Sequence, residues 1–252
     1  MVERMKPAAK YGLIALVVVL VAGAAGVFWF LRDDSPDEVD LDAAAQGVED
    51  RSTTTSPVGG GVATDSGDVS GTWTVDAETG EFDYESATGT FAGIRIEEEL
   101  ASIGSTTAVG RTGDVSGTVV IDGTTVTSAD LEVDVTTITT NESRRDDKVQ
   151  QALETSQFPT ATFSLTQPIE LGPDATNGEA VSVTGVGNLT VHGVTQAVEI
   201  PIEAKLVGDT IVMTASKEIT FSDYGVEVPE SPIVLSVDDV GILELQLLLV
   251  RS

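Results

Sequence analysis

The chain contains no cysteine and only one histidine, His192. The lack of cysteine excludes a disulfide framework, a thiolate metal site and a lipid-modified cysteine. One imidazole without thiolates cannot build a zinc site, so we expect no metal centre. The Gly-x-Ser-x-Gly turn of serine hydrolases is also missing. A carboxylate pair that acts by position alone stays open as a route to catalysis. No nucleophile–base pairing is visible, and we expect no catalytic residue.

Basic residues are scarce as well, with 13 Lys and Arg against 41 Asp and Glu and a formal net charge of −28. An acidic surface of this kind repels phosphate backbones, which argues against nucleic acid as a partner. It also disfavours a protein that lies flat on an anionic leaflet. The charge is typical of a domain that stays soluble in a salty exterior or cell-wall space.

The chain has one long apolar run, Tyr11–Leu31, which as a helix is about 31 Å long and carries no charge. Arg4, Lys6 and Lys10 precede it and acidic residues follow it, so residues 1–10 are expected in the cytoplasm and the C-terminal part outside. A cleaved signal peptide is the alternative, but the run is long for one and no small-residue cleavage site follows it. We therefore predict a retained, single-pass signal anchor in the cell membrane.

Residues 32–70 are acidic at first and then rich in serine, threonine and glycine. This composition cannot bury enough apolar surface to fold, so we predict a disordered linker. A flexible coil of this length spans about 30–35 Å on average. Such a linker leaves the domain close to the membrane but free to turn.

Residues 71–252 form one further domain, which is long enough to bury a core without disulfides. Its apolar residues alternate with polar ones, and this period-two pattern is typical of half-buried β-strands. The alternation is clearest in three sets, which are Leu131, Val133 and Val135; Val194, Val198, Ile200, Ile202, Ala204 and Leu206; and Leu243, Leu245, Leu247 and Leu249. Asp122-Gly123, Asn177-Gly178 and Gly208-Asp209 predict tight turns at hairpin spacing. The pattern indicates an all-β, antiparallel barrel or sandwich.

One segment departs from this alternation, between Asn141 and Glu154. Val149 and Leu153 lie four residues apart on a charged background, and Thr140 or Asn141 can cap the start. We predict a single helix here that crosses one end of the sheet.

Five short motifs add specificity through their order and spacing. They are Trp73-Thr74-Val75-Asp76, Asn141-Glu142-Ser143-Arg144-Arg145-Asp146, Phe158-Pro159-Thr160-Ala161-Thr162-Phe163, Asn188-Leu189-Thr190-Val191-His192-Gly193-Val194-Thr195 and Phe221-Ser222-Asp223-Tyr224-Gly225-Val226. From Gly71 to Val250 the chain thereby resembles the YceI-like, polyisoprenoid-binding family of secreted, lipocalin-like barrels. The resemblance implies an eight-stranded antiparallel barrel with an elongated apolar tunnel, in a periplasmic or extracellular setting.

Ten residues are candidate ligand contacts, because of the resemblance to the family and because of the chemistry of their side chains. They are Trp73, Phe91, Arg111, Arg144, Arg145, Phe158, Phe163, His192, Phe221 and Tyr224. The aromatic residues are expected in the core or along the tunnel, where as a set they serve either role. Arg144 and Arg145 can offer cations to a polar head group, or form ion pairs on the surface of the predicted helix.

His192 lies between Val191 and Gly193, and we expect it within a strand, opposite the face of Leu189 and Val191. A hydrogen-bonded residue of that strand or of the barrel mouth is the simpler interpretation. Contact with a ligand head group is the alternative.

Glycines occur at several positions within the predicted strands, at residues 89, 93, 117, 185 and 187. They remove bulk where a filled core needs it. A barrel of about eight strands has room either for packed side chains or for one small ligand. The glycines therefore favour an interior cavity.

Two functions from different classes remain. The first is a lipid-binding protein that holds a polyisoprenoid or an isoprenoid quinone for carriage, storage or sensing, with no cofactor besides that ligand. The second is a structural or adhesive β-domain of the cell envelope with a filled core. An apolar lumen with one open end separates the two, and assembly as a homodimer stays open.

We expect the N-terminal run to stay attached and the domain to face outward. Protease added to intact cells should then release a soluble fragment that begins between Arg32 and Gly71, identified by N-terminal sequencing. A mature protein that already begins just after Gly26 or Leu31 contradicts the anchor.

Overall fold

The computed structural model describes residues 35–54, 67–80, 82, 84, 88–100, 104–141, 143–227 and 234–252. The predicted anchor, Tyr11–Leu31, lies outside these ranges. Within them, no helix has both the length and the apolar content needed to cross a bilayer. The membrane anchor therefore stays a prediction.

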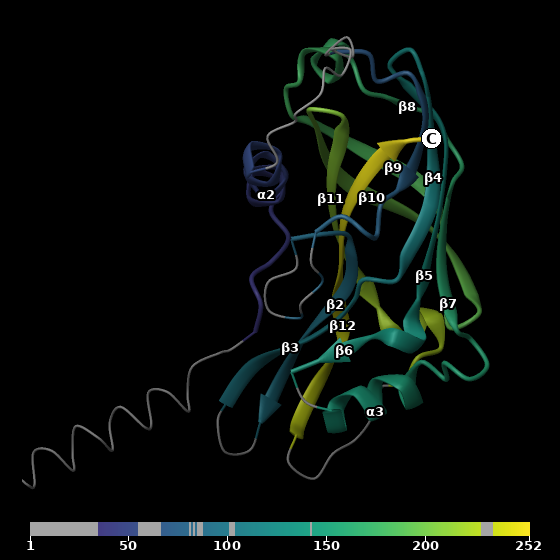
Figure 1. Cartoon of the computed structure of the whole chain (residues 1–252). Helices are drawn as coiled ribbons and strands as arrows, with labels where there is room; N and C mark the ends of the chain where they lie inside the picture. Colours follow the sequence, from purple (N-terminus) through teal and green to yellow (C-terminus); the bar gives the residue numbers. More distant parts are fainter. Residues whose placement is uncertain are drawn as a thin grey trace, which may run out of the picture. The chain divides into compact units, whose positions relative to one another are not determined.

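Eight antiparallel strands close into a barrel (Figure 1). In wall order they are β1 (Gly71–Val75), β4 (Val115–Asp122), β5 (Thr125–Asp134), β7 (Thr160–Leu165), β9 (Val181–Val191), β10 (Val194–Val207), β11 (Thr210–Thr220) and β12 (Val234–Arg251). Trp73 pairs with Arg251 and Val75 pairs with Leu249, which joins the last strand back to the first. The prediction of an all-β barrel with eight antiparallel strands is confirmed.

The wall continues beyond the closed ring because β12 is 18 residues long. Its N-terminal part pairs with β2 (Phe91–Leu100), which pairs in turn with β3 (Gly104–Thr112), and β3 pairs with β6 (Thr139–Thr140). The short β8 (Ile169–Glu170) pairs with β5. One strand, β12, therefore belongs both to the barrel and to this extension.

Tight turns with left-handed glycines join two pairs of consecutive strands, as predicted. Gly123 (φ 61°) lies between β4 and β5, and Gly208 (φ 59°) lies between β10 and β11. The third predicted turn is wrong as a hairpin. Asn177 instead ends a 3₁₀ helix, η2 (Pro173–Asn177), and Gly178 caps that helix in the left-handed conformation.

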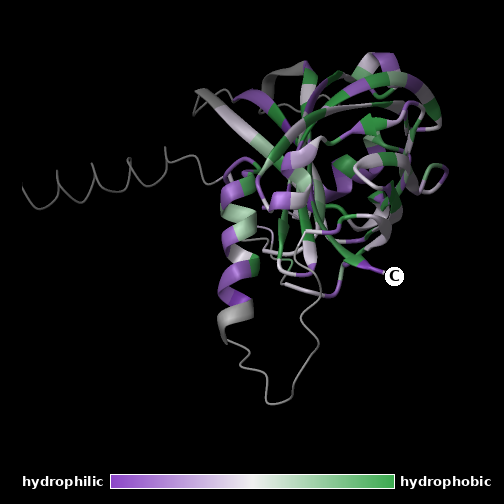
Figure 2. Cartoon of the chain, turned by 90° about the horizontal axis from the view of Figure 1, so that it is seen from above, coloured by the Kyte–Doolittle hydropathy of each residue, from purple (hydrophilic) through white to green (hydrophobic). Residues whose placement is uncertain are grey.

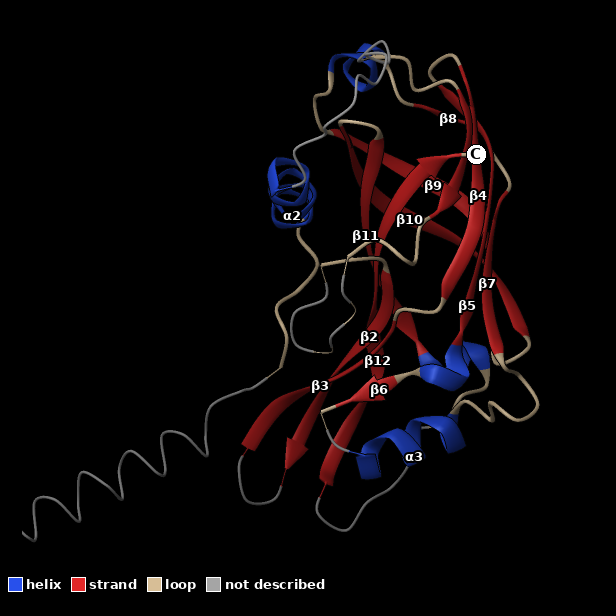
Figure 3. Cartoon of the chain, in the orientation of Figure 1, coloured by secondary structure: helices blue, strands red, loops and turns tan. Residues whose placement is uncertain are grey.

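The predicted helix is present as α3 (Ser143–Ala152), which crosses one end of the barrel (Figure 3). Asp146 in its first turn accepts hydrogen bonds from the backbone N–H and the hydroxyl of Thr140, both at 2.7 Å. Two further 3₁₀ helices, η1 (Val135–Thr137) and η3 (Phe221–Tyr224), follow β5 and β11. These short elements cover the end of the barrel where the strands stop.

A second helix, α2 (Leu41–Thr54), lies against the outside of the wall (Figure 2). Asp40 caps its start by accepting a 2.8 Å hydrogen bond from the backbone N–H of Ala43. One face of the helix packs on β10, β11 and β12, in a cluster formed by Leu41, Ala44, Ala45, Val48, Val207, Val212 and Leu248. The docked residues 35–54 are called the N-terminal stem below.

The stem corrects the prediction that residues 32–70 are disordered throughout. The apolar positions of α2 follow the helical spacing i, i+3, i+4 and i+7 from Leu41 to Val48. Acidic and small residues surround them, which gave the segment the composition of a linker. The helix is stable because the barrel supplies an apolar surface for that face. Residues 55–66 lie outside the described part of the chain.

We predict that Val48→Asp lowers the free energy of unfolding by about 2–4 kcal/mol. The valine is buried, and its burial contributes about 1.5–3 kcal/mol. A carboxylate at this position would lose its hydration without gaining a partner, which costs further free energy. Gln46→Asp is the matched control, since it adds the same charge at an exposed position of α2 and should change stability by less than about 0.5 kcal/mol. Urea denaturation measures both, and equal losses contradict a packing role for α2.

Candidate functional site

The barrel interior holds a cavity of about 90 Å³. Within the described part of the chain its lining is apolar apart from Glu179 and Lys205. Seven strands of the wall contribute, through residues that include Val119, Leu131, Leu165, Val183, Ile202, Met213 and Leu249. A lumen of this composition suits a hydrocarbon chain and offers few partners to a polar molecule.

The inner face of β10 shows that side chains do not fill this part of the lumen. Ile202 and Ala204 alternate with the exposed Glu203, as predicted, and yet are only partly buried. Strands β9 and β11 pair with β10 on both sides at these two positions. The accessible surface that the two residues keep therefore faces the lumen.

The open volume is nevertheless small. About 90 Å³ is room for about three water molecules, and a lipid chain needs more. A chain can therefore enter only when inner side chains change rotamer. Met213 is suited to this, because it lines the cavity and its unbranched thioether side chain adapts easily to new neighbours.

The interior next to η3 is filled. Leu189, Ile219, Phe221, Tyr224 and Val226 form a buried cluster there, which we call the lower cluster. Two predicted ligand contacts, Phe221 and Tyr224, thus belong to a packed core. Burial raises the pKa of the Tyr224 phenol, and the neighbouring Asp223 adds to that shift.

Trp73 packs in the core with Val69 and Leu249 and is 1% exposed. Its indole Nε1 donates a 2.8 Å hydrogen bond to the carbonyl of Val69. The Arg251 guanidinium lies over the ring, 4.8 Å from its centroid. Trp73 therefore packs beside the cavity and holds the segment that leads into β1.

Phe163 is the predicted contact that does line the cavity. Its ring rests on Gly187, where an added Cβ atom would overlap it. In the same way, a Cβ atom at Gly185 would lie 2.9 Å from Cδ1 of Ile202. The prediction that these glycines leave empty space is wrong at both positions, because a neighbouring side chain occupies the room.

His192 lies in the turn between β9 and β10, with φ 52°, and not within a strand as predicted. Gly193 shares that turn, which needs left-handed backbone at both positions. The imidazole Nδ1 lies 3.2 Å from the Tyr224 carbonyl, and Nε2 lies 3.7 Å from a Glu154 carboxylate oxygen. The ring of Phe158 meets it edge-on at 4.7 Å between centroids. His192 therefore joins three segments at this end of the barrel.

Two other predicted contacts, Phe91 and Arg111, lie on the outer face of the wall. Strand alternation places them there together with Glu244, whereas Leu243 and Leu245 point inward. The Arg111 guanidinium covers the Phe91 ring at 4.5 Å from its centroid. Neither side chain faces the lumen.

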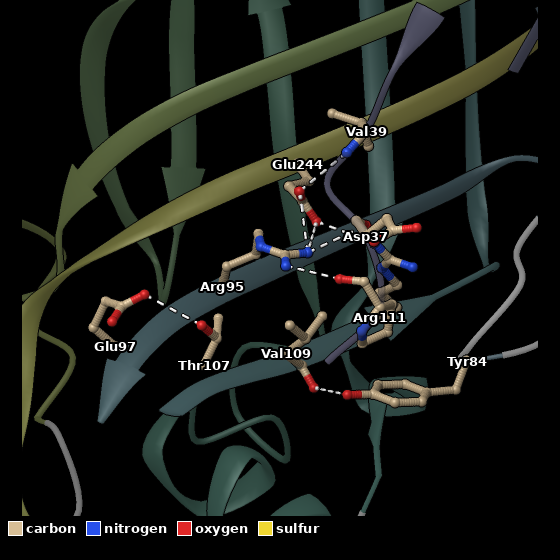
Figure 4. Close-up of polar contacts among 10 residues, drawn as sticks. Asp37, Val39, Tyr84, Arg95, Glu97, Thr107, Val109, Arg111 and Glu244 are labelled. Atoms are coloured by element: carbon tan, nitrogen blue, oxygen red, sulfur yellow. Dashed lines mark hydrogen bonds and ion pairs between the residues drawn. The ribbon is translucent and has the colours of Figure 1, made fainter. Parts of the chain in front are cut away.

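A buried charge cluster surrounds Arg111 on this outer face (Figure 4). Arg111 and Arg95 each place a guanidinium nitrogen 3.4 Å from the same Glu244 carboxylate oxygen. Arg111 also donates to the carbonyl of Asp37 at 2.6 Å, and Arg95 donates to that of Pro36 at 2.7 Å. Burial lowers the pKa of Arg111, while Glu244 opposes that shift. The cluster binds the stem to the wall.

Arg145 lies on α3 and contacts Glu98 of β2 at 3.3 Å and the side chain of Asn141. The side chain of Arg144 lies outside the described part of the chain. The structure therefore does not gather Arg111 and Arg145 at one mouth of the lumen.

Sequence reasoning missed several residues of the lumen and the role of Glu244. Leu165 and Met213 line the cavity, and the period-two position of Leu165 relative to Phe163 is the signal that could have identified the first. No local signal marks the cluster, because Glu244 is 149 residues from Arg95 and 133 from Arg111.

Comparison with known proteins gives matches in sequence and in structure. The family model of the YceI-like domain matches residues 41–248. A UPF0312 protein of Shewanella baltica is 30% identical over 149 residues, covering 54% of this chain and 73% of that protein. A UPF0312 protein of Shewanella sp. strain ANA-3 is 28% identical over 155 residues, covering 57% of this chain and 76% of that protein.

Two solved structures share the fold. A polyisoprenoid binding domain from Saccharophagus degradans, implicated in plant cell wall breakdown, superposes with a TM-score of 0.51 at 16% identity, covering 65% of this chain and 98% of that one. Burkholderia cenocepacia BcnA superposes with a TM-score of 0.50 at 20% identity, covering 69% of this chain and 98% of that one.

We predict that His192→Ala lowers the free energy of unfolding by about 1–2 kcal/mol and leaves lipid content unchanged. The variant loses a hydrogen bond that contributes about 1 kcal/mol, and alanine tolerates the left-handed backbone less well than the histidine that already adopts it. His192→Asn tolerates that backbone better and should lose less. Thermal denaturation and mass spectrometry of extracted lipid test this, and a large drop in lipid content at unchanged stability points to head-group contact instead.

Proposed function

This chain belongs to the YceI-like domain family, and from that premise we propose that it is a membrane-anchored, extracytoplasmic protein that holds an isoprenoid lipid in its barrel. The Saccharophagus degradans domain with the same fold is a polyisoprenoid binding domain, which supports this ligand class. The protein acts by binding and release, for carriage, storage or sensing. A structural domain with a filled core is the competing function.

The observation that carries the proposal is the apolar cavity of about 90 Å³ inside the barrel. Seven strands of the wall line it, and its lining is apolar apart from Glu179 and Lys205 among the described residues. A purely structural barrel gains stability from filling such a space. The cavity is therefore best explained as ligand space.

The charges near the cavity favour a neutral head group. Lys205 is the one cation among the described lining residues, and it lies 3.8 Å from Glu49 of the stem. Arg111, Arg145 and Arg251 are engaged elsewhere, by Glu244, Glu98 and backbone carbonyls. With a net charge of −28 and Lys205 as the one cation of the described lining, the site disfavours a pyrophosphate head. A quinone-like or alcohol head fits better.

Exchange with a membrane sets the energetics of loading. Moving a chain of about 40 carbons out of water formally gains about 30 kcal/mol at about 0.8 kcal/mol per CH₂. This exceeds the roughly 18–21 kcal/mol limit of non-covalent affinity, so water is not the relevant alternative. The lipid leaves a bilayer in which its tail is already dry. Transfer is then nearly balanced, and small contacts decide its direction.

The predicted anchor supplies proximity to that bilayer. The stem contacts the wall from Pro36 onward, and in the sequence Pro36 comes five residues after Leu31, the end of the predicted anchor. A short tether raises the effective concentration of the barrel at its lipid source. The anchor and the lumen thus serve one function.

The test is lipid partitioning between vesicles and the fragment of residues 35–252. The fragment is incubated with vesicles that carry labelled polyprenyl quinone or labelled polyprenyl phosphate and is then separated from them. We expect it to retain labelled quinone, and to retain less labelled phosphate than quinone. Retention of the phosphate alone contradicts the neutral head group. If neither label partitions into the protein, lipid binding is excluded and the structural domain takes its place.

A further inference from the structure

One aromatic side chain marks the boundary between the open and the filled parts of the interior. Phe163 lines the cavity and also packs against the lower cluster. Among the described residues it is the one that does both. A chain that enters the cavity and continues along the barrel therefore meets this ring.

The wall around Phe163 explains why the ring lies there. Phe163 sits on β7 in register with Leu131 of β5 and Leu189 of β9. The next inner position of β9 is Gly187, and the ring occupies the space that a side chain at that position would fill. Gly187 and Phe163 thus act as a pair, because a Cβ atom at 187 would overlap the ring and lie 2.6 Å from the carbonyl oxygen of Ser164, so that both must move.

The charged residues of the lining lie at the other end of the cavity. Glu179 is exposed and lies two residues before β9, and Val181, at the start of that strand, lines the cavity. Leu189, near the end of the strand, belongs to the lower cluster. The lumen therefore runs from a polar rim at Glu179 to a floor at Phe163.

We propose that Phe163 sets the length of the isoprenoid chain that this lumen accepts, an inference that rests on the proposed function. Gly187 lies six positions after Val181, which is about 20 Å along the strand at about 3.3 Å per residue. At a strand tilt of about 40°, the depth along the barrel axis is about 15 Å. An extended chain advances about 1.2 Å per backbone atom. Once inner side chains have changed rotamer, the lumen therefore encloses about 12 chain carbons, or about three isoprene units, and the rest of a longer chain stays outside it.

Substitutions that remove the Phe163 ring and substitutions that displace it should shift the accepted isoprenoid chain length in opposite directions. Phe163→Ala vacates the volume of one phenyl ring next to the filled lower cluster, so a chain about one isoprene unit longer gains access. Gly187→Ala displaces the Phe163 ring, and the β7 backbone at Ser164 must move with it because the added Cβ would lie 2.6 Å from that carbonyl oxygen, so shorter chains are favoured. Phe163→Leu keeps an apolar side chain of intermediate size and should give an intermediate length. It also carries the test if Phe163→Ala does not fold.

The experiment uses the full-length chain in detergent with photoreactive derivatives of geraniol, farnesol and geranylgeraniol, which share an alcohol head and differ by one isoprene unit each. Intact-mass spectrometry measures the crosslinked fraction for each. We expect the wild type to prefer farnesol over geranylgeraniol by about tenfold, as apolar pockets reject excess length. Phe163→Ala should remove most of that preference, and Gly187→Ala should move it toward geraniol.

Phe82→Ala is the control, since Phe82 is 39% exposed and lies outside the lumen. It should keep the wild-type preference. Thermal denaturation confirms that each variant is folded. Folded Phe163 variants with the wild-type preference overturn the proposal while leaving lipid binding intact. If no alcohol crosslinks to any variant above background, the proposed function itself fails.

Discussion

The structure depends on one strand, β12, which must be buried on both faces. Its inner face carries Leu247 and Leu249, which close the barrel against β1. Its outer face carries Glu244 and Leu248, which hold the stem. The strand also pairs with β11 and β2, so it cannot slip by one residue without exchanging the two faces. The closed barrel, its extension and the N-terminal stem therefore share a single register.

The stem is held by two kinds of contact with different consequences. The apolar face of α2 packs on β10, β11 and β12, and such packing tolerates small shifts. The cluster of Arg95, Arg111 and Glu244 gains little net stability, because burying three charges costs about as much as their pairing returns. Its hydrogen bonds to the carbonyls of Pro36 and Asp37 are directional. We infer that the cluster fixes where the stem docks, while α2 provides the affinity.

Inside the barrel, stability and ligand space are divided between two regions. The lower cluster, with η3 and the His192 turn, provides a filled core and seals one end. The cavity region gives up packing density, since about 90 Å³ between its side chains is unfilled. The fold stays stable with this cavity because packing in the lower cluster and packing of α2 on the outside of the wall compensate for the van der Waals contacts that the cavity lacks. Phe163 and Gly187 lie where the two regions meet.

The sequence by itself determined the fold class, the turns at Gly123 and Gly208, the position of α3 and the inner faces of the strands. These follow from local patterns, namely period-two alternation, left-handed glycines and helix capping. It did not reveal that the stem is ordered, because the apolar face of α2 is stable only against a surface formed more than 150 residues later, at Val207 and Leu248. Likewise, the sequence shows that Arg111 is a cation but does not show whether its guanidinium contacts a ligand or the stem. Only the tertiary structure, which brings Glu244 and the carbonyl of Asp37 to its guanidinium, decided between them.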